Sequence, residues 1–364
     1  MEQKKKLFFV GHLPGYGGAE KAITMVANAM AFKDYTVYLI SIGESNVVYP
    51  QDPRVNYISI PDIKGNKLLV IMNRLRQLRK IFKSLKPDLV ISFWFQASLL
   101  STILSKFQGF KVIYSERGDP GDSEYKGLLG MMRKIIFPFI DGFVFQSRGA
   151  QKFFPKWIHN KSTVIHNPVY IKYDDYPILK KRKKTIVNVG RLHPQKNQIC
   201  LIDAFSKVEK EFDDYRLEIY GDGDLRELLT KKIQENNLEK KVFLMGTTNI
   251  LADKISDSAM FILSSDYEGM PNALMEGMAL GIPCISTDCP PGGPREIIDH
   301  GLTGFLCKVG DSEELANYMK KILIDEELAY NMGVNAKQIC LTHSAPAIYG
   351  QWEEYFNNLL KDVR

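Results

Sequence analysis

The 364-residue chain lacks the hydrophobic and cysteine patterns of membrane and secreted proteins. It has no run of eighteen or more apolar residues, so we expect no membrane-spanning helix. Its first residues, MEQKKKLFFVGH, place basic side chains before only a short apolar run, and we interpret Leu7–Val10 as a buried strand rather than a signal peptide. The five cysteines form no C-x-x-C pair and have no histidine at metal-ligand spacing. We therefore predict a cytoplasmic protein with reduced thiols and no metal cofactor.

The charge of the chain is unevenly distributed. The net charge is +6, but residues 1–170 hold 24 Lys or Arg against 12 Asp or Glu, which is +12 and leaves 6 − 12 = −6 for the remainder. A basic first half attracts a polyanion or an acidic membrane surface, although a merely solvated positive face is as common. Because no recognised nucleic-acid-binding module is present, we expect no nucleic-acid partner.

Apolar runs alternate with amphipathic stretches along most of the chain, which predicts an α/β protein with doubly wound parallel sheets. The length suits two domains, which we place at residues 1–170 and 171–345, followed by a C-terminal helix at 346–364. The closing helices are expected at Ser312–Ile324, Glu326–Cys340 and Ala345–Leu360. The expected strands are Leu7–Val10, Thr36–Ile42, Asp88–Ser92, Lys111–Tyr114, Ile140–Phe145, Val164–Val169, Thr185–Gly190, Arg216–Gly221, Val242–Gly246 and Ala259–Leu263.

The stretch from Ser264 to Ile298 has the composition of a ligand-binding loop followed by a helix. Glu268 should lie just before the helix N-terminus, and Glu276 about two turns inside it. Carboxylates accept hydrogen bonds from sugar hydroxyls, and free amides at a helix N-terminus bind phosphates. The alternative is that both glutamates are ordinary solvated helix charges, and spacing alone does not decide between the two.

Three further loops follow predicted strands and carry glycines or cations. Arg191 and Lys196 follow the strand Thr185–Gly190 and precede a helix with Asn197 as its cap, an arrangement that collects a diphosphate. The loop at Gly221 contains two aspartates, but it lacks a calcium-loop pattern and is interpreted as a tight turn. The glycine-rich loop before residue 19 is not a G-x-G-x-x-G dinucleotide motif, yet its glycines indicate close approach of a ligand.

Two stretches of the first half are basic and amphipathic. In residues 64–86, apolar residues such as Leu68, Leu78 and Phe82 fall near helical spacing and cations crowd the other surfaces. In residues 126–139, three positive charges accompany eight large apolar residues. The first stretch is either a solvated surface helix or a contact for lipid head groups or a lipid-linked diphosphate. The second is either a buried helix that stops at Pro138 or a membrane contact.

Four motifs together resemble one family. They are similar to signatures of the family 4 retaining glycosyltransferases, which include bacterial lipopolysaccharide, capsule and lipid-linked oligosaccharide transferases. The motifs are E-G-x-P-x-x-x-x-E from Glu268 to Glu276, G-x-P-x-I from Gly281, G-R-L-x-x-x-K-N from Gly190 and G-G-A-E-K from Gly17. The resemblance implies a GT-B fold, in which two Rossmann-like domains face each other across a cleft and the C-terminal helix returns to the first domain.

The resemblance also implies roles for individual residues. Glu268 would contact the donor sugar, Glu276 would hold the ribose hydroxyls, and Arg191 and Lys196 would bind the diphosphate as catalytic cations. The remaining donor-binding residues expected on this basis are Gly17, Gly18, Gly190, Gly221, Thr247, Gly269, Met270, Pro271 and Asn272. Thr247 would meet the nucleobase through backbone atoms.

The acceptor side departs from the family pattern. Related enzymes often have Ser-Glu-His where this chain has Ser115-Glu116-Arg117, and arginine cannot accept a proton at physiological pH. Charge stabilisation of a phosphate or acidic acceptor remains open for Arg117, and Glu116 is a candidate for orienting the acceptor hydroxyl in catalysis. The expected acceptor- or anion-binding residues are Glu20, Lys21, Arg74, Arg79 and Arg117.

The function that the resemblance implies is transfer of a hexose or N-acetylhexosamine from a nucleotide sugar, expected to be UDP-linked, to a glycan with retention of configuration. Fixed cations can stabilise the leaving diphosphate without a metal. A polyprenyl-diphosphate-linked acceptor, used in surface polysaccharide assembly on the cytoplasmic face of the plasma membrane, fits the basic first half. The alternatives are a nucleotide-sugar epimerase of the same architecture and a non-catalytic, two-lobed sugar-binding protein.

Overall fold

The computed structural model describes residues 4–13, 17–43, 49–118, 127–169 and 175–361. The chain packs into two units, Met1–Asn167 with Pro346–Arg364 (unit 1) and Pro168–Ala345 (unit 2). The expected domain boundary at 170/171 lies outside the described residues, as do residues 14–16 of the glycine-rich loop. No helix in the described part of the chain is long and apolar enough to cross a membrane.

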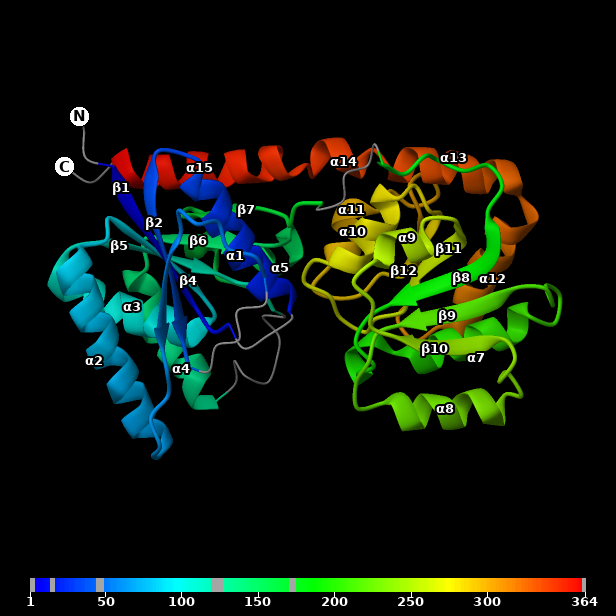
Figure 1. Ribbon diagram of the computed structural model, residues 1–364, viewed down its shortest axis with the longest axis horizontal. Helices are drawn as coiled ribbons and strands as arrows, with labels where there is room; N and C mark the ends of the chain where they lie inside the picture. Colours follow the sequence, from blue (N-terminus) through cyan, green and yellow to red (C-terminus); the bar gives the residue numbers. More distant parts are fainter. Residues whose placement is uncertain (1–3, 14–16, 44–48, 119–126, 170–174, 362–364) are drawn as a thin grey trace. The chain divides into compact units, whose positions relative to one another are not determined.

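Unit 1 is built on a parallel sheet of seven strands in the order β3-β2-β1-β4-β5-β6-β7 (Figure 1). Its strands are β1 (Lys5–Gly11), β2 (Tyr35–Ile42), β3 (Asn56–Ile60), β4 (Leu89–Phe93), β5 (Lys111–Ser115), β6 (Gly142–Phe145) and β7 (Ser162–Val164). Its helices are α1 (Gly18–Ala31), α2 (Lys67–Leu85), α3 (Phe95–Gln108), α4 (Gly127–Ile136), the 3-10 turn η2 (Phe137–Phe139), α5 (Arg148–Lys152), α6 (Lys156–His159) and α15 (Ala345–Lys361).

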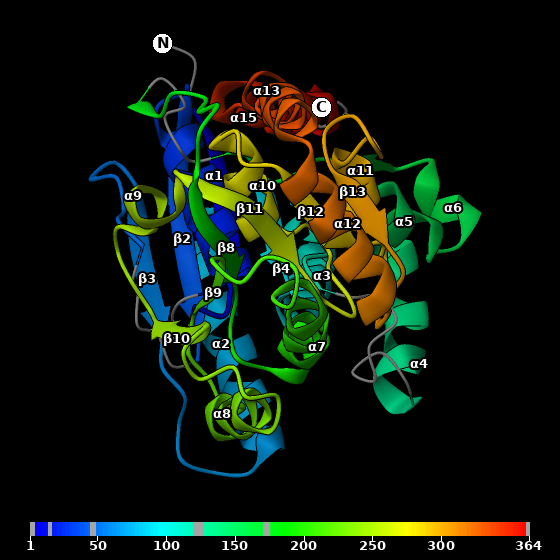
Figure 2. The same cartoon turned by 90° about the vertical axis from the view of Figure 1, so that its right-hand side faces the viewer.

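Unit 2 has a parallel sheet of six strands in the order β10-β9-β8-β11-β12-β13 (Figure 2). Its strands are β8 (Lys183–Val189), β9 (Arg216–Tyr220), β10 (Val242–Gly246), β11 (Ser258–Leu263), β12 (Cys284–Thr287) and β13 (Phe305–Cys307). Its helices are η4 (Pro194–Lys196), α7 (Gln198–Val208), α8 (Arg226–Glu235), α9 (Leu251–Ile255), α10 (Asn272–Ala279), α11 (Gly293–Ile297), α12 (Ser312–Ile324), α13 (Glu326–Ala336) and α14 (Ile339–Thr342).

The inner strands are buried on both faces because helices cover each sheet on two sides. In β1, Leu7 and Phe9 enter one core while Phe8 and Val10 enter the opposite one, as alternating side chains of a strand must. Apolar runs in the sequence predicted the inner strands of both sheets except β12, Cys284–Thr287. The prediction of two Rossmann-like parallel sheets is therefore confirmed.

The C-terminal helix α15 packs on unit 1, as expected. Trp352 and Phe356 lie in the same core as Leu7 and Phe9 of β1. The hydroxyl of Tyr355 donates a hydrogen bond to the carbonyl of Lys161 at 2.8 Å. These contacts tie the last helix to the first sheet of the chain.

Several local expectations were wrong at the edges of elements. Residues 56–60 lie in a stretch expected to be largely helical but form β3, and the strand expected at Val164–Val169 is β7, which ends at Val164. The helix expected over Glu326–Cys340 ends at Ala336 and resumes at Ile339. Helix α2 starts at Lys67 with Asn66 as its cap, and it leaves Leu68 exposed because only its later turns reach the core, through Leu78 and Phe82.

Candidate functional site

The carboxyl ends of β8 and β11 form a topological switch point in unit 2. The two strands are parallel neighbours, with Val187 opposite Phe261. The helix after β8 packs on one face of the sheet, through Leu201 with Ile186, whereas the helix after β11 packs on the other, through Leu274 with Val187. The connections that follow β8 and β11 therefore run to opposite faces of the sheet, and open α/β sheets bind ligands where two neighbouring connections diverge in this way.

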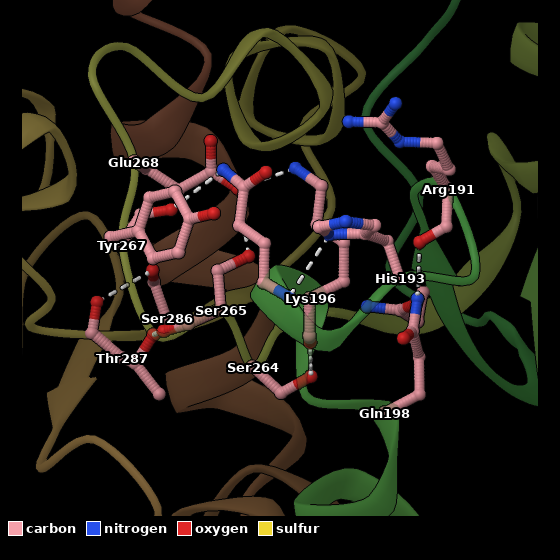
Figure 3. Close-up of polar contacts among 12 residues, drawn as sticks. Arg191, His193, Lys196, Gln198, Ser264, Ser265, Tyr267, Glu268, Ser286 and Thr287 are labelled. Carbon is pink, nitrogen blue, oxygen red and sulfur yellow. Dashed lines mark hydrogen bonds and ion pairs between the residues drawn. The ribbon is translucent and has the colours of Figure 1, made fainter. Parts of the chain in front are cut away.

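Lys196 and Glu268 meet at this switch point (Figure 3). The Nζ atom of Lys196 lies 2.5 Å from Oε1 of Glu268, and the hydroxyl of Ser265 donates to the same oxygen at 2.7 Å. Glu268 is only 6% exposed, so its charge needs these partners. Two of the four side chains predicted to gather at the donor site are thus in contact, although they are 72 residues apart in sequence.

Further hydrogen bonds join the connection after β8 to the connection after β11. Asn197 has a left-handed backbone conformation (φ 43°), and its side chain both caps α7 and donates to Asp266 at 2.7 Å. Because that geometry ends η4 and starts α7, it sets the position of Lys196. The other links are Gln195 Nε2 to the Tyr267 carbonyl, the Asp266 amide to the Gln195 carbonyl, and Ser264 Oγ to the Lys196 carbonyl.

Sequence reasoning did not single out Ser264, Ser265 or Gln195, which hold these loops together. Their signal was available: each is a polar residue placed directly after a buried strand or within the loop that follows one. His193 was also passed over. Its Nδ1 accepts a hydrogen bond from the Gln195 amide at 3.2 Å, which fixes the start of η4.

A recess of about 240 Å³ lies at the carboxyl ends of β8, β9 and β10. It is lined by Gly190, Arg191, Gly221 and Thr247, four of the residues predicted to bind the donor. Gly221 has φ +137°, and a Cβ atom there would collide with the carbonyl oxygen of Gly190. Only glycine therefore allows these two loops to approach so closely. The side chain of Arg191 is exposed at this recess.

The loop that carries Glu268 is held from a second side. The Glu268 amide donates to the Pro290 carbonyl at 2.8 Å, and Gly293 packs so closely on the Gly269 carbonyl that a Cβ atom would not fit. Helix α10 starts at Asn272 with Pro271 as its N-cap, and Met270 is buried beneath the loop.

Glu276 is the fifth residue of α10 and half-buried. It therefore lies little more than one turn inside the helix and not two turns as expected, because the helix starts one residue after Pro271.

The thiol of Cys289 lies near the ion pair. Burial raises its pKa to about 12, and the negative charge of Glu268 adds to the effect. The thiol is therefore protonated at neutral pH and is not a nucleophile.

In unit 1 the predicted glycines lie at the N-terminus of α1. Gly17 is the N-cap and Gly18 the first residue of the helix, and the Lys21 amide donates to the Gly17 carbonyl at 3.0 Å. The carboxylate of Glu20 folds back against Gly17. It occupies the positive end of the helix, where an anion would otherwise bind.

Glu116 is buried in the turn that follows β5. It is 3% exposed, and its carboxylate accepts hydrogen bonds from the Tyr114 hydroxyl at 2.6 Å, from Arg133 at 3.1 Å and from the amides of Arg117 and Gly118. The carboxylate therefore shapes the turn after β5, and the catalytic role expected for Glu116 stays a prediction.

Arg117 is likewise engaged within unit 1. Its guanidinium donates to Ser115 Oγ at 2.9 Å and to Asn167 Oδ1 at 3.0 Å, and it lies 5.3 Å from the ring centroids of both Phe93 and Trp352. These contacts join β4, β5 and α15. Arg117 therefore helps to tie these elements together, and its role in acceptor binding stays a prediction.

Arg74 differs from the solvated surface cation that its helix pattern predicted. It is buried, pairs with Asp62 through two hydrogen bonds of 2.8 and 2.7 Å, and reaches Gly43 at the carboxyl end of β2. A buried guanidinium needs such a partner. Arg79, one turn further on, is exposed as expected.

Comparison with known proteins places the chain among glycosyltransferases. Residues 173–339 match the family described as Glycosyl transferases group 1, and residues 16–173 match the family described as Glycosyltransferase Family 4. An uncharacterized glycosyltransferase of Haemophilus influenzae is 24% identical over 96% of this chain and 99% of its own length. An undecaprenol-diphosphate-glycan alpha-1,4-N-acetyl-D-galactosaminyltransferase of Campylobacter jejuni is 25% identical over 95% of this chain and 97% of its own length.

Solved structures share the fold. The lipopolysaccharide outer core galactosyltransferase WaaB in its apo form has a TM-score of 0.78 at 21% identity and covers 97% of this chain and 99% of its own. HepE of Anabaena, in complex with UDP, has a TM-score of 0.80 at 17% identity, with 97% and 100% covered. Two adjoining family matches from residue 16 to residue 339, laid over two parallel Rossmann-like sheets, show that this chain belongs to the family 4 glycosyltransferases of GT-B fold.

Proposed function

We propose that the protein transfers a hexose or N-acetylhexosamine from a UDP-sugar to a lipid-linked glycan, with retention of configuration and at the cytoplasmic face of the plasma membrane. The observation that carries the donor assignment is the contact of Lys196 with Glu268 at the switch point of unit 2. The nearby recess lined by Gly190, Arg191, Gly221 and Thr247 offers space for the nucleoside. The likeness to HepE, described in complex with UDP, supports the choice of nucleotide.

In this proposal the cations stabilise the leaving diphosphate. The ammonium of Lys196 and the exposed guanidinium of Arg191 belong to one short loop that leaves β8 and leads into α7. A diphosphate bound there attracts Lys196 away from Glu268, which releases that carboxylate to accept a hydrogen bond from a sugar hydroxyl. Charges fixed before the glycosidic bond breaks need little reorganisation in the transition state. We propose on this ground that transfer requires no metal.

The lipid-linked acceptor is proposed from the basic charge of the first half and from the name of the Campylobacter relative, which gives an undecaprenol-diphosphate-linked substrate. Participation in surface polysaccharide assembly follows from such an acceptor. Epimerisation of a nucleotide sugar remains the second candidate, because an epimerase of this architecture would use the same donor recess.

The test is incubation of the protein with single UDP-hexoses and UDP-N-acetylhexosamines, followed by mass spectrometry of the nucleotide products. Slow release of UDP from one donor, accelerated by an acceptor glycan lipid, supports the proposal. Isomerised nucleotide sugar without UDP release supports the epimerase instead. Activity that survives a chelator supports metal independence, whereas loss that added Mg²⁺ restores contradicts it.

A further inference from the structure

Helices α4, α5 and α6 belong to the same side of unit 1 (Figure 2). Together with η2 they form the walls of an apolar groove. The groove has a volume of about 550 Å³, and most of its lining is aromatic or proline: Phe137, Pro138, Phe153, Phe154, Pro155 and Trp157. A contiguous apolar surface of this kind on a folded unit indicates an interaction site.

The exposed side chains of the groove are held in place by buried neighbours. Phe153 is 58% exposed and Trp157 43% exposed, whereas the adjacent Phe154 and Ile158 are buried in the core of unit 1. Helix α5 is capped by Ser147, whose hydroxyl accepts from the Ala150 amide at 3.0 Å. The aromatic rings therefore project from a fixed framework, so ordering them on binding costs little entropy.

The segments that form the groove hold more cations than acids, although Arg133, which lines it, is buried and pairs with Glu116 at 3.1 Å. Residues 127–161 contain six Lys or Arg and one Asp, which is a net +5. The one acid, Asp141, accepts a hydrogen bond from the Val112 amide of β5 and so points toward the sheet. Lys152 and Lys156 alternate with Phe153 and Trp157 along the chain and are exposed. Aromatic rings with lysines beside them are the composition of surfaces that lie in the interface of an anionic bilayer.

Helix α4 extends the apolar surface. Met131 and Ile135 are each 62% exposed and lie four residues apart, on one side of the helix, while Lys134 lines the groove. The other basic helix, α2, also exposes apolar residues at its N-terminal end, namely Leu68, Leu69 and Met72, but none of these three is aromatic. The geometry points to the surface of α4, η2, α5 and α6, here called the aromatic-basic face, as the part of unit 1 that binds an anionic lipid bilayer.

This inference deepens the proposed function, on which it rests in one respect: a lipid-linked acceptor requires the enzyme to work at a membrane. Phe153, Trp157, Met131 and Ile135 enter the interface, and Lys152 and Lys156 pair with lipid phosphates. The donor site belongs to unit 2 and shares no residue with this face.

The experiment measures co-sedimentation of the whole protein with vesicles, in the absence of any donor. The vesicles are phosphatidylcholine alone or phosphatidylcholine with about one third phosphatidylglycerol. Emission of Trp157 gives a second readout, because Trp352 is buried and Trp94 partly buried, which leaves Trp157 as the exposed one of the three tryptophans. We expect binding to the anionic vesicles with a blue shift of the emission.

Three variants test the face. Met131→Ser/Ile135→Ser/Phe153→Ser should lose vesicle binding by at least about tenfold, because burial of each large side chain is lost. Lys152→Ala/Lys156→Ala should lose about fivefold per lysine, and less at high salt. The matched control, Leu68→Ser/Leu69→Ser/Met72→Ser, removes as many exposed apolar residues from α2 and should bind as the parent protein does.

Absence of binding, or loss of binding in the α2 variant alone, would overturn the assignment of this face. So would a concentration-dependent dimer that the Met131/Ile135/Phe153 variant abolishes without any vesicle binding, since the face would then join two copies of the chain. UDP release from the donor is measured in parallel on the same variants. If the protein binds vesicles but releases no UDP, the proposed function is contradicted and the membrane-binding face is not. If it releases UDP but does not bind vesicles, only the membrane-binding face is contradicted.

Discussion

Replacement of Lys196 by Met tests both the ion pair and its role in transfer. The change leaves the carboxylate of Glu268, whose side chain is 8% exposed, without its cation. Removing one partner of a fully buried pair costs about 3–5 kcal/mol. The Lys196 side chain is 19% exposed, and Ser265 still donates a hydrogen bond to Glu268 in the variant. We therefore expect the free energy of unfolding to fall by about 3 kcal/mol, the lower limit of that range. For a unit of this size that lowers Tm by about 6–12 °C.

The same change should lower kcat by about 10²–10³, the usual cost of losing one fixed charge that stabilises the transition state. The double variant Lys196→Met/Glu268→Gln separates the two effects. It removes both charges, so stability should return to within about 1 kcal/mol of the parent while transfer stays lost. Lys231→Met is the control, because Lys231 pairs with Glu235 at 3.7 Å on the exposed surface of α8 and its loss should cost less than about 1 kcal/mol.

The assays are thermal unfolding by circular dichroism and release of UDP from the donor identified by mass spectrometry. A single variant that unfolds earlier but turns over as fast as the parent would refute the catalytic role of Lys196. A double variant as unstable as Lys196→Met would refute the account of the pair.

Two further changes probe the donor recess and the thiols. Gly221→Ala should lower stability by at least about 2 kcal/mol and raise KM for the donor, because a Cβ would collide with Gly190. Gly350→Ala, at a position on α15 where a Cβ atom meets nothing, should stabilise the protein by about 0.5–1 kcal/mol. If the two substitutions change stability by the same amount, the close approach of Gly221 to Gly190 is not what requires glycine. Burial raises the pKa of Cys200 to about 11 and that of Cys307 to about 12, so native thiols should resist labelling near pH 8. Because a cysteine in the unfolded chain loses its proton near pH 8.5, the free energy of unfolding that these thiols contribute should fall as the pH rises from about 8.5 to about 11–12, which urea unfolding can measure. Rapid labelling of the native protein would contradict the burial of the thiols.

Local sequence was sufficient for the strands that lie inside the two sheets, with the exception of β12, Cys284–Thr287, which was not expected. Such strands are buried on both faces and read as continuous apolar runs, as in Leu7–Val10 and Ala259–Leu263. Among the edge strands, β10 was predicted correctly, whereas β3 and β7 differ from the expectations and β13 was not expected. An edge strand has one hydrogen-bonded neighbour and can stay short and partly polar, so its pattern differs little from that of a loop.

The donor loops could be found from the sequence because their requirements are local. A glycine with positive φ at 221, an asparagine cap at 197 and a helix start after Pro271 each depend on the conformation of a few consecutive residues. The loops also follow strand ends, and parallel strands bring those ends to one edge. The contact of Lys196 with Glu268 is a consequence of that topology.

The charged residues of unit 1 show what only the tertiary structure decided. Amphipathic spacing placed Arg74 in solvent, but Asp62 and the end of β2 enclose it. The motif at Arg117 did not indicate that its guanidinium lies 5.3 Å from the rings of both Phe93 and Trp352, the second of which is 235 positions away in the chain. The periodicity of a helix or strand predicts the face on which a side chain lies. The group that this side chain contacts belongs to a distant element, and the packing of that element is not visible in the local sequence. The sequence by itself therefore determined the elements and their loops, and packing decided which charges are free to act.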